Sequence, residues 1–160
     1  MTIQVFVHTI VSLIAIVTGF VVLAGLFKAE RLEGWTAWFL ILSVATSLTG
    51  VVLPAAQFLP SHAVAIIALV VLLFTVMAKY TFNLRGGWRR IYVIGAVISL
   101  YLNVFVLIAQ AFQKVPALKA LAPTGSEPPF AIVQGIVLIG FIIKGYLAVR
   151  RFAPRDMLAA

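Results

Sequence analysis

The chain has 160 residues, of which 64% are hydrophobic and 10% are charged, and its mean hydropathy is +1.18. These values exclude a soluble domain of this size and indicate an integral membrane protein. The net charge of +8 does not indicate nucleic-acid binding, because the basic residues lie in short segments between apolar runs, where they set membrane orientation.

Five apolar runs are long enough to cross a hydrocarbon core of about 30 Å as helices. They cover residues 3–27, 35–53, 62–80, 91–112 and 130–149. The segments between them contain the glycine, proline or charged residues at which helices end. The sequence therefore predicts an all-α membrane protein in which residues 1–160 form a single transmembrane domain, a bundle of five helices.

The longest connection, residues 113–129, separates the fourth run from the fifth. Its stretch "KVPALKAL" predicts a short helix that lies in the membrane interface. Pro128 and Pro129 suit the first turn of the next helix, where a backbone N–H group is not needed. Glu127 would then stand at the positive end of that helix dipole, which favours a carboxylate.

The basic residues divide unequally between the two ends of the predicted bundle. Ten of them fall at one end: Lys28, Arg31, Lys79, Arg85, Arg89, Arg90, Lys144, Arg150, Arg151 and Arg155. Only Lys114 and Lys119 fall at the other. Because cytoplasmic segments carry the excess of lysine and arginine, we expect the N-terminus outside and the C-terminus in the cytoplasm.

Small and polar residues recur at helical spacing, as expected of faces where membrane helices pack closely together. The stripes are His8, Ser12, Ala15 and Gly19; Ser43, Thr46, Ser47 and Gly50; and Gly95, Ser99, Asn103 and Gln110.

Bulkier polar side chains gather toward the predicted outer end, where burying them in hydrocarbon requires partners. We expect six of them to line a polar pocket there: His8, His62, Asn103, Gln110, Glu127 and Gln134. Gln57 would lie at the same mouth, and no matching cluster is expected at the inner end. Each residue also has a simpler interpretation: hydrogen-bonded histidines, a helix-start carboxylate, and amides that join neighbouring helices.

Three classes of function fit this pattern. The first is a non-enzymatic membrane protein that binds a small ligand in the outer pocket, or packs in the bilayer as a homo-oligomer or within a larger membrane complex. The second is a redox or metal site: a haem b held by His8 and His62, a metal ion held by His8, His62 and Glu127, or a quinone. The third is a small-molecule transporter. The first is favoured, because no short metal-ligand motif or catalytic motif occurs and cysteine is absent.

Three stretches carry a resemblance to a known group of proteins: "FVHTIVSLIAIVTGFVVLAGL", "LPSH" and "LNVFVLIAQAFQKVPALKALAPTGSEPPFAIVQG". Together they resemble small multi-pass inner-membrane proteins of proteobacteria whose function is unknown. The resemblance implies a bacterial inner-membrane location and no particular activity.

Overall fold

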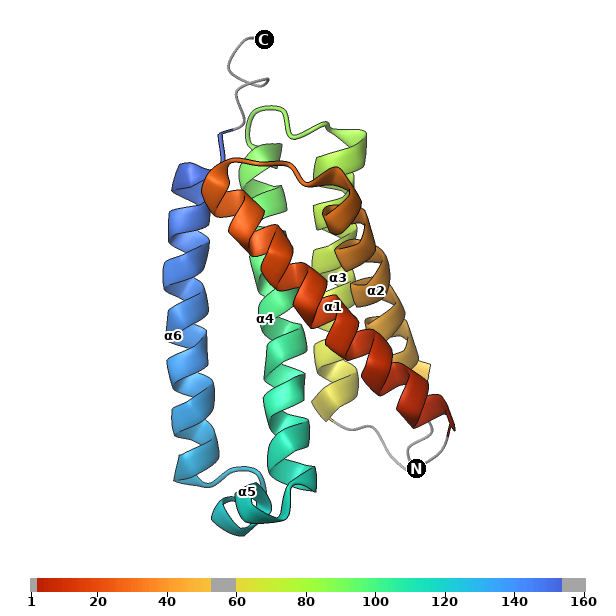
Figure 1. Ribbon diagram of the computed structural model, residues 1–160, viewed down its shortest axis with the longest axis vertical. Coiled ribbons are helices and arrows are strands. Elements are labelled where there is room, and N and C mark those ends of the chain that lie inside the picture. Colours follow the sequence, from red (N-terminus) through yellow and green to blue (C-terminus); the bar gives the residue numbers. More distant parts are fainter. Residues whose placement is uncertain (1–2, 53–59, 154–160) are drawn as a thin grey trace.

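The computed structural model describes residues 3–52 and 60–153, which form helices and short connections (Figure 1). The elements in chain order are α1 (Ile3–Lys28), α2 (Glu33–Val52), α3 (Pro60–Val76), the π-helical turn η1 (Met77–Thr81), α4 (Trp88–Lys114), α5 (Pro116–Leu121) and α6 (Pro128–Arg151). Five of these helical segments are long and apolar enough to cross a membrane. In the described residues, the five predicted long apolar helices are confirmed in number and order.

The helix ends differ slightly from the prediction. Helix α4 runs from Trp88 to Lys114 and is therefore longer at both ends than the predicted run of residues 91–112, because it includes the polar residues that flank that run. The short helix expected in "KVPALKAL" is present as α5, and α6 begins at Pro128, as expected. Leu53, the predicted end of the second span, lies outside the described residues, as do Gln57 and Arg155.

The connection between α1 and α2 is tight and folds back on α1. Ala29 and Leu32 have φ values of 58° and 42°, a left-handed conformation that L-residues rarely adopt. The side chain of Leu32 packs against Gly25, where an added Cβ would lie 2.5 Å from Leu32 Cδ1. Gly25 is therefore needed for the close approach of this connection to the end of α1.

Helices α1 to α4 form a closed ring, in which α1 packs on α2, α2 on α3, α3 on α4 and α4 on α1. Helix α6 packs outside this ring against α4 and α1 (Figure 1). In the most apolar part of α6 only 17% of the residues are buried, compared with 44% in α1 and in α4. Helix α6 is therefore a peripheral helix with most of its surface exposed.

Small residues allow the ring to close tightly. An added Cβ at Gly19 would lie 2.6 Å from Leu100 Cδ1 and 2.8 Å from Phe39 Cε2. At Gly95 an added Cβ would collide with the Thr75 hydroxyl. The predicted packing role of these glycines is thus confirmed at the α1–α4 and α3–α4 contacts.

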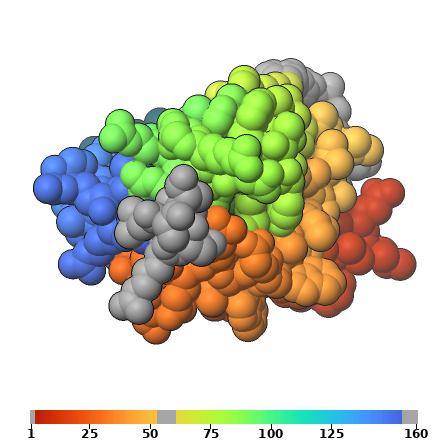
Figure 2. Space-filling model, turned by 90° about the horizontal axis from the view of Figure 1, so that it is seen from above, coloured from red at the N-terminus to blue at the C-terminus, as the bar shows by residue number. Residues whose placement is uncertain are grey.

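The described basic residues of the ten-residue group lie at one end of the bundle, which we call the basic end. It comprises the α1–α2 connection, the η1–α4 connection and the last turns of α6, and Figure 2 looks onto it. Lys114 and Lys119 lie at the opposite end, which we call the α5 end.

Candidate functional site

His8 lies near the start of α1, half-buried at the α5 end. Its Nδ1 atom is 2.7 Å from the Thr49 hydroxyl of α2. A Cβ added at Gly50 would stand 3.6 Å from His8 Cε1, so the glycine gives the imidazole ring room beside α2. His8 therefore joins α1 to α2 by a hydrogen bond.

Asn103 and Gln134 make the corresponding bonds at two other helix contacts. The Asn103 amide donates to the Ser43 hydroxyl over 3.1 Å, a buried bond between α4 and α2. The Gln134 amide donates to the Phe105 carbonyl over 3.0 Å, which joins α6 to α4. Gln134 is 7% exposed, and its Oε1 atom is buried without a hydrogen-bond partner in residues 3–52 and 60–153.

Glu127 occupies the position just before α6 and closes the preceding turn with its side chain. Oε1 accepts hydrogen bonds from the Thr124 backbone N–H at 2.9 Å and from the Thr124 hydroxyl at 2.8 Å, and Oε2 accepts from the Ser126 N–H at 3.1 Å. Gly125 has φ of 76°, which a turn of this kind requires. These hydrogen bonds lower the pKa of Glu127 to about 2, and the bond from the Thr124 backbone N–H has the largest effect.

The remaining two candidates, His62 and Gln110, are half-buried near the start of α3 and near the end of α4. His8, His62, Gln110, Glu127 and Gln134 thus lie toward the α5 end, whereas Asn103 lies near the middle of α4. His8, Asn103 and Gln134 serve three different helix contacts. In the described ranges 3–52 and 60–153, no three His, Asp or Glu side chains are grouped as metal ligands. The set of His8, His62 and Glu127 is therefore not assembled in this structure.

A second polar cluster lies at the basic end, where none was expected, so the prediction of a single polar end is wrong. Lys79 of η1 is buried, and its Nζ atom is 2.7 Å from Glu33 Oε2 at the start of α2. The ammonium group also lies 5.5 Å from the ring centroids of Tyr80 and Tyr92. The Tyr92 hydroxyl is 3.4 Å from that of Thr36, which is fully buried.

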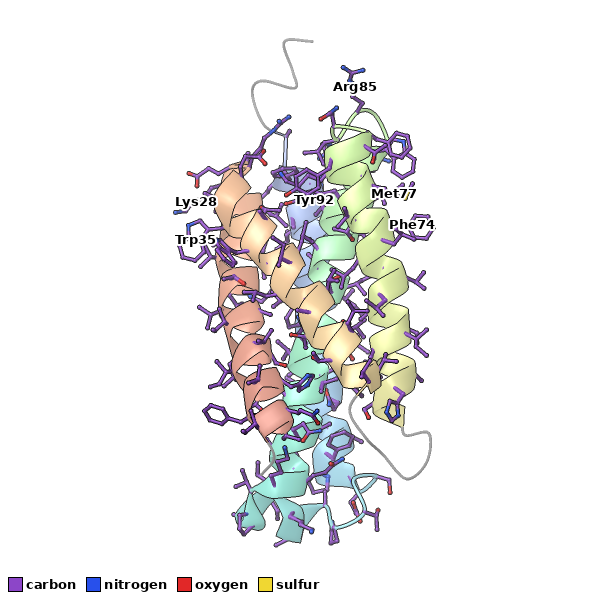
Figure 3. The ribbon with its side chains drawn as sticks, turned by 90° about the vertical axis from the view of Figure 1, so that its right-hand side faces the viewer. Lys28, Trp35, Phe74, Met77, Arg85 and Tyr92 are labelled. Atoms are coloured by element: carbon purple, nitrogen blue, oxygen red, sulfur yellow. The ribbon has the colours of Figure 1, made fainter. Side chains whose placement is uncertain are left out.

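The π-helical turn explains why the sequence pattern missed this cluster. The Phe82 N–H bonds to the Met77 carbonyl over 3.0 Å, five residues back, so the turn holds one residue more than an α-helical turn. In the sequence, a lysine near the end of an apolar run is expected to extend its ammonium group to the membrane interface. In the structure, the π-helical turn holds Lys79 inside the bundle. Figure 3 shows Tyr92 between the helices, whereas Trp35 and Phe74 point outward. The sequence did contain one signal for this cluster, since Lys79 and Glu33 carry opposite charges and lie at the same predicted end of the bundle.

Arg89 fixes the end of α6 to the start of α4. Its Nη1 atom donates to the Val149 carbonyl at 3.1 Å and to the Phe152 carbonyl. These carbonyls lie at the negative end of the α6 dipole, where a cation is favourable. The Phe152 ring packs on Tyr92, with centroids 5.8 Å apart.

Two apolar grooves flank α6. A groove of about 370 Å³ lies between α4 and α6, and its lining includes Tyr101, Leu138, Phe141 and Tyr146. A groove of about 440 Å³ on the other side of α6 reaches Phe27 of α1 and also contains Lys144 and Arg151.

Comparisons with known proteins add no function to this geometry. No protein-family model, curated protein or solved structure matches the chain. The class that the fold itself supports is a helical bundle in which the described residues form five helices of membrane-spanning length.

Proposed function

We propose that this chain is a non-enzymatic integral membrane protein of a bacterial inner membrane that binds a small amphipathic ligand. The N-terminus would lie outside and the C-terminus in the cytoplasm, which makes the α5 end the outer end. The asymmetry of basic residues between the two ends supports this orientation.

The observation that carries the proposal is the buried amide of Gln134. Its Nε2 atom bonds to α4, while its Oε1 atom has no partner among the described residues. Leaving a buried acceptor unsatisfied costs about 1–3 kcal/mol. A ligand that donates a hydrogen bond to this oxygen would recover part of that free energy.

The groove between α4 and α6 supplies the apolar part of such a site. Gln134 lies one helical turn beyond Leu138, and Phe105 lies one turn beyond Tyr101, at the same end of the groove. Its volume of about 370 Å³ is within the roughly 300–1,000 Å³ of small-molecule sites. The ligand would place its apolar body along the groove and its donor at Gln134.

The other five predicted residues would surround the polar end of this ligand or hold the helices that do. Asn103 and His8 already serve the second role through Ser43 and Thr49. Glu127 orders the turn from which α6 begins. His62 and Gln110 lie at the same end of the bundle and are the further candidates for ligand contact.

The test is to purify the protein in mild detergent and identify what is retained, by mass spectrometry of an organic extract, absorption spectroscopy and metal analysis. We expect a small amphipathic molecule, retained less by Gln134→Leu than by the parent. Gln113→Leu, which changes an exposed glutamine of α4, is the matched control.

Other outcomes would overturn the proposal. A haem or quinone spectrum, or a stoichiometric metal lost in a His8 or His62 variant, would establish the redox or metal alternative instead. Extracts that contain nothing above the detergent blank, or equal retention by Gln134→Leu and Gln113→Leu, would refute a Gln134 site.

A further inference from the structure

We infer that the groove between α1 and α6 binds one anionic phospholipid, with an acyl chain along α6 and the phosphate group at Lys144 and Arg151. This site is separate from the α4–α6 groove and lies at the opposite end of the bundle from Gln134. With the proposed orientation the lipid would belong to the cytoplasmic leaflet.

The lining of the groove follows one face of α6. Its α6 residues are Gly140, Ile143, Lys144, Leu147 and Arg151. Spacings of three and four place these residues on the same side of a helix. The lining begins at Gly140, deep in the bundle, and ends at Arg151, the last residue of α6. This face of α6 therefore changes from apolar to cationic toward the membrane surface. A phospholipid has the same order of apolar and charged parts.

The groove is open at Gly140, one of its lining residues. A Cβ built at this position meets no atom within 4 Å. On the opposite wall Phe27 offers an aromatic side chain from the last turns of α1. The space of about 440 Å³ is thus bounded by apolar groups on two helices, as an acyl chain requires.

The two cations are available to an anion. Lys144 and Arg151 are both exposed, and no acidic side chain in the described part of the chain pairs with either of them. Arg150, by contrast, donates to the Tyr146 hydroxyl at 3.0 Å. Lys144 lies two turns, or about 10 Å, deeper than Arg151, and its flexible side chain can extend toward the surface. Basic pockets between membrane helices bind anionic lipid head groups in this manner.

The charge test compares phosphatidylglycerol with phosphatidylcholine of identical chains, added to the delipidated protein in detergent and measured by native mass spectrometry. We expect the protein to retain phosphatidylglycerol preferentially. Lys144→Gln and Arg151→Gln should each reduce this retention about fivefold, since one cation near an anionic lipid contributes about that factor. The pair Lys114→Gln and Lys119→Gln, at the α5 end, is the matched control.

The groove test keeps the charges and fills the space. Gly140→Leu should reduce retention of phosphatidylglycerol, and Gly135→Leu should not, although both positions are open in the bundle. Thermal unfolding of each variant checks that the bundle is intact. Three results would each overturn the inference. The first is equal retention of the two lipids, and the second is an equal loss of phosphatidylglycerol in the Lys144 and Arg151 variants and in the Lys114 and Lys119 variants. The third is a folded Gly140→Leu variant that retains as much phosphatidylglycerol as the parent.

Because the proposed ligand site depends on Gln134 and this one on Lys144 and Arg151, their failures are distinguishable. Loss of phosphatidylglycerol in the Lys144 variant with unchanged content of the Gln134 ligand supports the lipid site alone.

Discussion

The ion pair between Lys79 and Glu33 predicts an unequal response to removing its two members. The Lys79 side chain is 4% exposed and that of Glu33 is 59% exposed, so water can solvate one partner and not the other. Glu33→Gln leaves a buried ammonium group without its counter-charge. Lys79→Met leaves a carboxylate that simply returns to water.

The magnitudes follow from these exposures. Removing one partner of a fully buried pair costs about 3–5 kcal/mol, whereas an exposed pair contributes about 0.2–1 kcal/mol. For Glu33→Gln we expect a loss of unfolding free energy of about 1–3 kcal/mol, since solvent screens one side of the pair. For Lys79→Met we expect about 1 kcal/mol or less, because a side chain of similar length fills the same space beside Tyr80 and Tyr92.

The assay is reversible unfolding of the single and double variants in detergent micelles. The double variant should be about as stable as Lys79→Met, because no buried charge is left unpaired. Glu30→Gln, in the exposed α1–α2 connection, controls for the general loss of a carboxylate. If Lys79→Met costs as much as Glu33→Gln, or more, then the pair does not act as a buried cation held by its partner.

Three further predictions concern orientation, packing and pH. A reporter fused after Ala160 should be active in the cytoplasm and one inserted near Thr124 outside; the reverse result would contradict the proposed orientation. Gly19→Ala should lower stability by about 1–3 kcal/mol through overpacking on Leu100, while Gly50→Ala, whose Cβ meets only ordinary contacts, should cost less than half as much by the same unfolding assay. The folded-state pKa of Glu127 lies below its ordinary value of 4.5, so its contribution to stability is present above pH 4.5 and is lost as the pH falls toward 2. As the pH falls through this window, the thermal midpoint should fall less in Glu127→Gln than in the parent. If the two midpoints fall in parallel with pH, the role of Glu127 in the turn is refuted.

The helical spans were predictable because the membrane requires long apolar runs, which a single sequence displays directly. The start of α6 at Pro128 and the presence of α5 were also predictable from local sequence, namely the two prolines in the first turn of α6 and the stretch "KVPALKAL". The glycine and serine stripes indicated which faces pack. They did not indicate that Gly19 faces α4 as well as α2, because the pairing of helices depends on side chains far apart in the sequence.

For the candidate residues, the sequence predicted the depth along each helix, but not the contacts that the side chains make. Depth along each helix correctly placed His8 and Gln134 toward one end, since helical rise fixes depth from residue number. The hydrogen bond from His8 to Thr49 joins residues 41 positions apart and required the fold. Lys79 was placed at the correct end but not in the interior, since a one-residue change in the turn moves a side chain between lipid and core.

The closed ring of α1 to α4 also bears on how the protein is assembled during synthesis. Helix α6 follows α1 and α4 in the chain, so it leaves the ribosome after both of the helices on which it docks. Its docking surface can therefore form before α6 enters the bilayer, and none of the contacts that close the ring has to wait for it. Arg89 and Phe105, the residues that bond to α6, lie on α4 and are already in place when it arrives. Insertion of α6 after α1 to α4 would thus leave the ring made before it unchanged.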